Sequence, residues 1–158
     1  MAVSVDVSAM EQAIDLLRLL RDVSAVSAER LGQYLATPGM SLLKRHLQRY
    51  GGIVLDEAFL VDLFETVGSN PVLKPDDHVF LRSAKRGWQL LDTLEPQLRS
   101  VDFQALVERA VVMANEFLPE QLDEDITVYF LYGIRGTGIV LDKEIGIDVC
   151  DPTLFREG

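Results

Sequence analysis

The residues that could act as nucleophiles or metal ligands are few and far apart. The chain has one thiol, Cys150, and two imidazoles, His46 and His78, which lie 32 positions apart. A zinc site needs three or four ligands that converge, and two histidines share a helix face when they are about four positions apart. Neither an HExxH nor a CxxC motif occurs. The sequence therefore predicts no metal site and no cofactor in this chain.

Cys150 is poorly placed to act as a nucleophile. It lies close in sequence to Asp148 and Asp151, and nearby negative charge disfavours the reactive thiolate. The GxSxG motif is also missing, which excludes a nucleophile elbow of the α/β-hydrolase type. We interpret Cys150 as a structural residue and expect no complete catalytic site within these 158 residues.

A glycine-rich turn is the best candidate for binding an anion. Gly133, Gly136 and Gly138 surround Arg135, and the backbone N–H groups of such a turn can point at an anion. The turn joins two expected strands, however, and so lacks the helix N-terminus that a dinucleotide or P-loop site uses. The alternative is a hairpin turn in which glycine supplies positive φ angles. The sequence favours the turn and leaves anion binding by these four residues as a second interpretation.

Acidic residues are concentrated late in the chain. Their spacing does not match an EF-hand loop, so we interpret them as a solvated acidic surface. The formal net charge of −10 opposes binding to nucleic acid, because each phosphate contact requires Lys or Arg. We therefore expect no nucleic-acid partner. The late acidic residues are Glu120, Asp123, Glu124, Asp125, Asp142, Glu144, Asp148 and Asp151.

Apolar residues up to Phe117 repeat at the three- and four-residue steps of helices. Ser8 begins a sequence that fits a capping box, and Pro38 fits the first position of a helix. Pro96 should break or kink the fifth helix. The aromatic residue Trp88 falls on the apolar face of that helix, together with Phe80, and is expected in the core. The expected helices span 9–22, 28–35, 38–50, 57–67, 77–94 and 101–117.

The period changes after the sixth helix. Residues 127–132 are rich in aromatic and β-branched side chains and are typical of a strand, and two shorter strands are expected at 139–141 and 145–149. The sequence therefore predicts an α+β fold that is mainly helical, with about six helices followed by a small C-terminal sheet or hairpin. A chain of 158 residues is expected to form a single domain, with a helical part over 8–118 and a β part over 126–150.

The sequence shows neither a membrane span nor a secretory signal. Its longest apolar runs are far shorter than the roughly 20 residues that cross a bilayer. The first residues contain no positively charged region followed by a long apolar run. A single cysteine cannot form a disulfide within the chain. We therefore expect a cytoplasmic protein with no membrane span.

The order of several segments resembles a bacterial family of zinc-dependent peptidases of the gluzincin type. In such proteins a helical region and a small sheet precede a helix that bears HExxH. The resemblance covers Leu31 to Asp151, and its motifs are loose. The segments that carry it are Leu31–His46, the helix near Asp56–Val67, Phe117–Pro119, Val128–Leu131, the Gly133–Gly138 turn and Ile145–Asp148.

The resemblance implies that this chain is the non-catalytic, N-terminal portion of such a peptidase. The family's metal-binding histidines and general-base glutamate would follow the strand 145–149, so none of them can be assigned to a residue here. Zinc is expected only if a longer protein supplies the HExxH helix. By analogy, the strand would be the sheet edge that holds a peptide substrate. Its residues are Ile145, Gly146, Ile147, Asp148 and Val149.

Two other interpretations remain open. The chain could be a self-contained helical adaptor that binds a peptide or protein, or that forms a homo-oligomer through an exposed apolar face. It could also be a small ligand-binding domain centred on the glycine turn and Arg135. The peptidase interpretation predicts an exposed apolar patch where further helices would pack.

Overall fold

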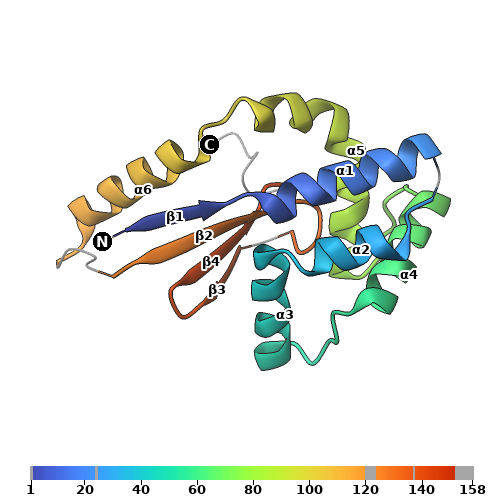
Figure 1. The fold of residues 1–158 in the computed structure, drawn as a ribbon, viewed down its shortest axis with the longest axis horizontal. Helices are drawn as coiled ribbons and strands as arrows, with labels where there is room; N and C mark the ends of the chain where they lie inside the picture. The colour runs from blue at the N-terminus through green and yellow to red at the C-terminus, as the bar shows by residue number, and fades with distance from the viewer. Residues whose placement is uncertain (1, 24, 120–123, 137, 152–158) are drawn as a thin grey trace.

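The computed structural model describes residues 2–23, 25–119, 124–136 and 138–151. These residues form six helices and four strands (Figure 1). The helices are α1 (Ser8–Val23), α2 (Ala28–Leu35), α3 (Pro38–Tyr50), α4 (Glu57–Ser69), α5 (Val79–Arg99) and α6 (Phe103–Phe117). The strands are β1 (Val3–Asp6), β2 (Ile126–Leu131), β3 (Gly138–Leu141) and β4 (Glu144–Asp148). The predicted α+β fold with mainly helical content is confirmed.

The four strands form one mixed sheet in the order β1-β2-β4-β3. β1, β2 and β4 are parallel, and β3 is antiparallel to β4. The prediction that the β part spans only residues 126–150 is wrong, because β1 pairs with β2 from the other end of the sequence. Four residues with two valines are too short a pattern to identify a strand, and the pairing that stabilises β1 comes from a segment more than 120 positions away.

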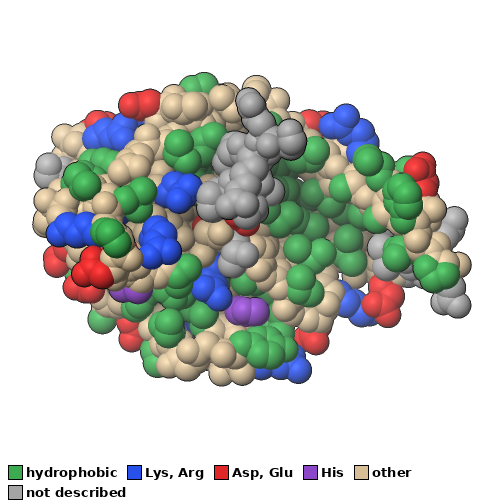
Figure 2. Space-filling view, turned by 180° about the vertical axis from the view of Figure 1, so that it is seen from behind, with side chains coloured by type: hydrophobic (Ala, Val, Ile, Leu, Met, Phe, Trp, Pro, Cys, Tyr) green, Lys and Arg blue, Asp and Glu red, His purple; other side chains and the backbone are tan. Residues whose placement is uncertain are grey.

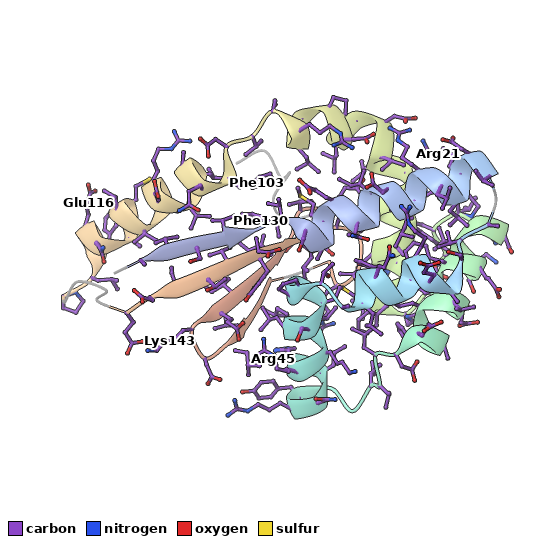
Figure 3. The ribbon with its side chains drawn as sticks, in the orientation of Figure 1. Arg21, Arg45, Phe103, Glu116, Phe130 and Lys143 are labelled. Carbon is purple, nitrogen blue, oxygen red and sulfur yellow. The ribbon has the colours of Figure 1, made fainter. Side chains whose placement is uncertain are left out.

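Helices cover the two faces of the sheet unequally. On one face of the sheet, here called the front face, α1 and α3 pack against β2, and α3 also packs against β3 and β4. The opposite face is called the rear face. Gly39 of α3 allows this close approach, since a Cβ atom there would lie 3.0 Å from side-chain atoms of Ala9 and Leu131. On the rear face α6 lies over β1, and Phe103 of α6 packs against Phe130 at a centroid distance of 4.4 Å (Figure 3). The rear face over β4 has less helical cover.

Helix α5 continues through Pro96 to Arg99, so of the two outcomes expected there, a break or a kink, the break is wrong. Contacts with α1 hold the last turns of α5 in place: Arg18 forms ion pairs of 2.7 Å with Asp92 and 2.6 Å with Glu95. Leu94 is buried on the same segment. Packing and ion pairs therefore outweigh the hydrogen bond that proline cannot donate.

Of the helix starts predicted above, Pro38 is confirmed as the first residue of α3. The side chains of Ser27 and Asp56 accept hydrogen bonds from backbone N–H groups of the first turns of α2 and α4. Ser8, in contrast, is the first residue of α1 and does not cap it. The carboxylate of Asp6 instead accepts hydrogen bonds from both the backbone N–H and the hydroxyl of Ser8. An ionised carboxylate is a stronger acceptor than a hydroxyl, which explains the exchange of roles.

A buried ion pair fixes the chain that leads into α5. The Lys85 ammonium lies 2.9 Å from the Asp77 carboxylate and also donates to the carbonyl of Val72 at 2.8 Å. The backbone N–H of Lys74 and the Lys85 ammonium lower the pKa of Asp77. The loop 70–78 is thereby attached to the middle of α5. None of the helices in the described part of the chain is long and apolar enough to cross a membrane.

Candidate functional site

The glycine-rich loop after β2 surrounds a buried carboxylate that comes from β4. Asp148 is fully buried, and one of its oxygens accepts hydrogen bonds from the backbone N–H groups of Ile134, Arg135 and Gly136 at 2.8–2.9 Å. Its other oxygen accepts from Gly133 at 3.0 Å and from Cys150 at 2.9 Å. Five backbone donors therefore satisfy a charge that would be costly to bury alone.

This arrangement changes the interpretation of the predicted anion site. Gly133 and Gly136 adopt positive φ angles of 64° and 72°, as the turn interpretation expected. Their N–H groups converge like those of an anion site, but the anion is the protein's own Asp148. Gly138 begins β3 and takes no part in the hydrogen bonds to Asp148. The expectation that Asp148 belongs to a solvated acidic surface is wrong, because these donors draw it into the interior.

The loop is also not a turn between paired strands. β2 pairs with β1 and β4, whereas the hairpin of this sheet joins β3 to β4. The side chain of Arg135 lies over the ring of Phe80, with its guanidinium carbon 5.7 Å from the ring centroid. Its buried Nε atom has no hydrogen-bond partner among the described residues. The side chain of Arg135 therefore points toward α5, and only the backbone N–H of this residue joins the donors around Asp148.

The predicted substrate-binding strand is not an edge. β4 is hydrogen-bonded to β2 on one side and β3 on the other, so its backbone cannot add a peptide strand. That part of the prediction is wrong because β3 folds back along β4. Of its residues, Gly146 and Asp148 are buried, and Ile147 and Val149 line an apolar groove. The edge strands among the described residues are β1 and β3.

The remaining acidic residues that the structure describes serve different purposes. Glu144 forms a two-pronged ion pair with Arg45 of α3 at 2.6 and 3.0 Å, and accepts a hydrogen bond from the hydroxyl of Tyr129 at 3.0 Å. Arg45, followed by Tyr129, lowers the pKa of Glu144 against the opposing effect of burial. Asp125 accepts from the backbone of Ala2, while Glu120 and Asp123 lie outside the described residues.

The thiol and the imidazoles lie apart from one another. Cys150 is fully buried, and burial, followed by the charge of Asp148, raises the pKa of its thiol. His78 caps α5 by accepting a hydrogen bond from the backbone N–H of Leu81 at 3.2 Å. His46 stacks loosely on Tyr50 at a centroid distance of 5.1 Å. Among residues 2–23, 25–119, 124–136 and 138–151, no three His, Cys, Asp or Glu side chains are grouped to hold a metal ion.

An apolar groove on the rear face is the most distinctive surface feature. It has a volume of about 410 Å³ and runs between α6, the end of α5 and the sheet. Figure 2 shows hydrophobic side chains gathered in a hollow on this side of the molecule. Among the described residues in its lining, Gln97 is the one with a polar side chain. The groove is lined by Leu94, Gln97, Leu98, Val101, Phe103, Leu106, Val107, Ala110, Phe130, Ile147 and Val149.

Sequence patterns alone did not reveal this groove. The apolar face of α6 was recognised, but an amphipathic pattern indicates only that a helix face is apolar. Just Val107 and Val111 of α6 are buried, while Leu106 and Ala110 remain exposed beside the groove. One signal in the sequence could have revealed the groove. Helix α6 has more apolar residues than it can bury against a single strand, so some of its apolar surface must remain uncovered or face another segment.

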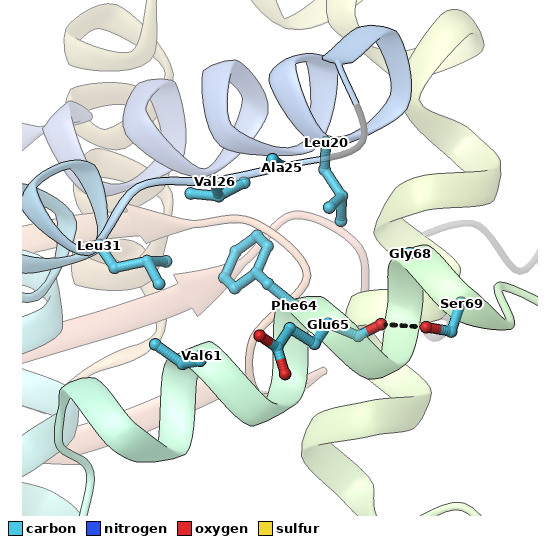
Figure 4. Close-up of a pocket in the computed structure, with 9 residues that line it drawn as sticks. All are labelled: Leu20, Ala25, Val26, Leu31, Val61, Phe64, Glu65, Gly68 and Ser69. Carbon is cyan, nitrogen blue, oxygen red and sulfur yellow. Dashed lines mark hydrogen bonds between the residues drawn. The ribbon is translucent and has the colours of Figure 1, made fainter.

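A second pocket lies between α1, α2 and α4 (Figure 4). Its volume is about 480 Å³, and its lining includes Leu31, Val61, Phe64 and one carboxylate, that of Glu65. The hydroxyl of Ser69 is already bonded to a backbone carbonyl of α4. A ligand site normally combines an apolar wall with several convergent polar groups, which this pocket lacks.

The rear groove is therefore the candidate functional site, and its chemistry is that of apolar contact rather than catalysis. Comparison with protein-family models, with curated proteins and with solved structures finds no match to this chain.

Proposed function

We propose that this chain is a non-catalytic docking module whose rear groove receives an amphipathic helix. The observation that carries the proposal is the apolar groove between α6 and the sheet, with one polar side chain, Gln97, in its lining. Helices that dock in grooves bind mainly through an apolar face, which suits such walls. The exposed apolar patch also meets the expectation for surfaces that contact other polypeptide segments.

The sheet supports a helix as the occupant. Parallel strands normally have both faces covered by helices, and three of the four strands here are parallel. Among the residues that the structure describes, the front face has α1 and α3, whereas the rear face has α6 over β1 and a groove beside β4 that no further helix fills. A helix laid beside α6 would contact Phe130, Ile147 and Val149 and would complete the rear layer. A small ligand would be held less well, since polar groups that fix its orientation are missing.

A display selection tests this proposal directly. Helical peptides of about 18 residues, long enough to cross a small domain, would be selected on the immobilised full chain. We expect enriched peptides with apolar residues at three- and four-residue steps. The variant Ala110→Arg places a charged side chain in the exposed wall of the groove and should weaken their binding by about tenfold or more, or at least 1.4 kcal/mol. Val54→Arg, on an exposed loop, is the matched control and should bind like the wild type.

Enriched peptides without a helical apolar pattern would contradict the proposal. So would helical peptides that bind Ala110→Arg as tightly as the wild type. Circular dichroism of both variants establishes that they keep the helical content of the wild type, because both substitutions are at exposed positions.

A second candidate is the peptidase interpretation, in which the docked helix belongs to the same polypeptide and bears HExxH. The open rear face favours it, because an apolar patch is what that interpretation requires. Under this proposal zinc would be held by the additional helix and not by residues of this chain. The protein isolated from its native source should then contain about one zinc ion per molecule. A mass that matches residues 1–158 alone, without zinc, would eliminate this candidate and leave the adaptor function.

A further inference from the structure

The outer face of α6 carries a second apolar stripe that is separate from the groove. Val107 and Val111 point toward the sheet and are buried, whereas Val112 is 62% exposed and Met113 is 61% exposed on the opposite side of the helix. A shallow hollow of about 380 Å³ lies on this outer face. It is lined by Ala105, Glu108, Arg109, Val112 and Met113.

The spacing of the stripe is that of a helix–helix seam. Ala105, Arg109, Val112 and Glu116 follow one another at steps of four, three and four residues, which repeat every seven. At about 100° per residue, these side chains share one face of α6. None of the residues that line this outer hollow also lines the groove, although Met113 follows Leu106 by seven residues and so borders the flank that carries Leu106 and Ala110.

Two opposite charges are placed symmetrically about the centre of this stripe. Arg109 lies three residues before Val112, and Glu116 lies three residues after Met113. Both charged residues are exposed, and neither forms an ion pair among the described residues (Glu116 is labelled in Figure 3). A two-fold axis between Val112 and Met113 would exchange these positions between two antiparallel helices. Such an arrangement is the self-complementary contact that two-fold dimers use.

We propose that a second copy of this chain packs antiparallel on the outer face of α6. Val112 and Met113 of both copies form the apolar centre, and the Arg109 guanidinium of each copy pairs with the Glu116 carboxylate of the other. Each pair closes one end of the apolar centre. The inference does not rest on the proposed function, because none of the residues that carry it lines the groove.

Charge reversal tests this arrangement without disturbing the fold. In Arg109→Glu, two carboxylates would face each other at each end of the interface, and in Glu116→Arg two guanidinium groups would do so. Each single variant should dissociate about tenfold more readily than the wild type or worse, because like charges across an interface repel. In an equimolar mixture of the two variants, two carboxylates of one chain face two guanidinium groups of the other in the mixed dimer, so dimers should be restored. The control Arg30→Glu changes an exposed arginine of α2 and should leave the dimer intact.

A double variant tests whether opposite charges at positions 109 and 116 restore the dimer when both substitutions are in the same chain. In Arg109→Glu combined with Glu116→Arg on one chain, each end of the interface again brings a carboxylate to a guanidinium group, with the two positions exchanged. This double variant should therefore dimerise like the wild type. A protein that had merely lost its fold through either substitution would not recover dimers when the second is added.

The measurement is sedimentation velocity of the full chain over a range of concentrations. Wild type, Arg30→Glu and the double variant should sediment as dimers, and each charge variant alone as monomers. A monomeric wild type at the highest concentration would overturn the proposal. Single variants that remain dimeric, or a double variant that stays monomeric, would also overturn it by showing that the contact lies elsewhere.

Discussion

The carboxylate of Asp148 lies 2.8 Å from the backbone nitrogen of Gly136, so a side chain of β4 occupies the centre of the glycine-rich loop. Four further backbone N–H groups donate to the same carboxylate. The N–H groups of the loop therefore bind a carboxylate of the same chain, and not an external anion. Its glycines serve to wrap the backbone around a buried charge, and this links the end of β2 to the end of β4.

Replacing this carboxylate should destabilise the fold. Asp148→Asn puts an amide NH₂ group among five N–H donors and removes the charge, so we expect the free energy of unfolding to fall by about 3 kcal/mol or more. Urea denaturation followed by circular dichroism measures the change. Asp142→Asn, at an exposed residue with a positive φ angle that asparagine tolerates, is the control and should stay within about 0.5 kcal/mol of wild type. Equal stability of the two variants would contradict the assigned role of Asp148.

The same carboxylate helps to keep Cys150 inert. Burial raises the pKa of the Cys150 thiol, and the charge of Asp148 adds to the effect. The native protein should therefore react with iodoacetamide at pH 8 at least about a hundredfold more slowly than the protein in urea, because the thiolate is the reactive species. Mass spectrometry of time points measures both rates. Rapid labelling of the folded chain would show that the thiol is accessible and would remove its structural interpretation.

Gly87 should resist substitution because α5 crosses the loop at that residue. A Cβ atom there would lie 3.0 Å from the Tyr132 ring and 3.2 Å from the Cα atom of Gly133. The Tyr132 ring cannot easily withdraw, since its hydroxyl donates to the Gly87 carbonyl at 2.8 Å. We expect Gly87→Ala to lower the free energy of unfolding by about 1–3 kcal/mol.

The matched control for this change is Gly32→Ala in α2. A Cβ atom at Gly32 would meet only the Glu57 carboxylate at 3.9 Å, so alanine should stabilise the helix by about 0.5–1 kcal/mol. Thermal denaturation of both variants measures whether the melting temperature falls in Gly87→Ala and rises in Gly32→Ala. If both variants gained stability, the close contact between α5 and the loop would be excluded.

Acid should weaken the contact between α3 and the sheet. Arg45 and Tyr129 hold the pKa of Glu144 below its ordinary value of 4.5. Because the folded-state pKa is lowered, the stabilisation is complete above pH 4.5 and is lost as the pH falls through the lower folded value. Glu144→Gln should cost about 1 kcal/mol at neutral pH and flatten the decline in stability below that pH. Urea titrations from about pH 6 to about pH 3 measure this, with Glu65→Gln, at an exposed position of α4, as the control. An acid response in Glu144→Gln identical to wild type would refute the assignment.

The helices could be predicted from the sequence because their apolar residues repeat with the helical period. Pro38 marked the start of α3 correctly, since proline suits the first helical position, where its missing N–H group would have no partner in the helix. Pro96 was misleading because ion pairs from Arg18 of α1 keep α5 continuous, and these contacts come from 74 or more positions away. Strand β1 was missed for the same reason: its partner, β2, is distant in sequence.

The site was predictable only in part. The glycines of the loop indicated positive φ angles correctly, and the buried role of Asp148 could have been suspected from an acidic residue among Ile147, Val149 and Cys150. The excess of apolar residues on α6 could have indicated an unfilled apolar surface, but the position of the groove could not be foreseen, because it depends on how α6 lies over β1. The strand order determines which strands lie at the edge of the sheet. It depends on contacts between distant segments of the chain and not on local patterns.

Photo-crosslinking in the protein's native cells tests the docking function most directly. A photoreactive residue in place of Leu106 would lie at the groove, and the same residue in place of Val54 would report on an exposed loop as the control. We expect position 106 to crosslink to one amphipathic helix, within the same polypeptide or in a partner protein, and position 54 not to do so. Equal, scattered crosslinks from both positions, or none from Leu106, would contradict the proposal that this groove holds a helix.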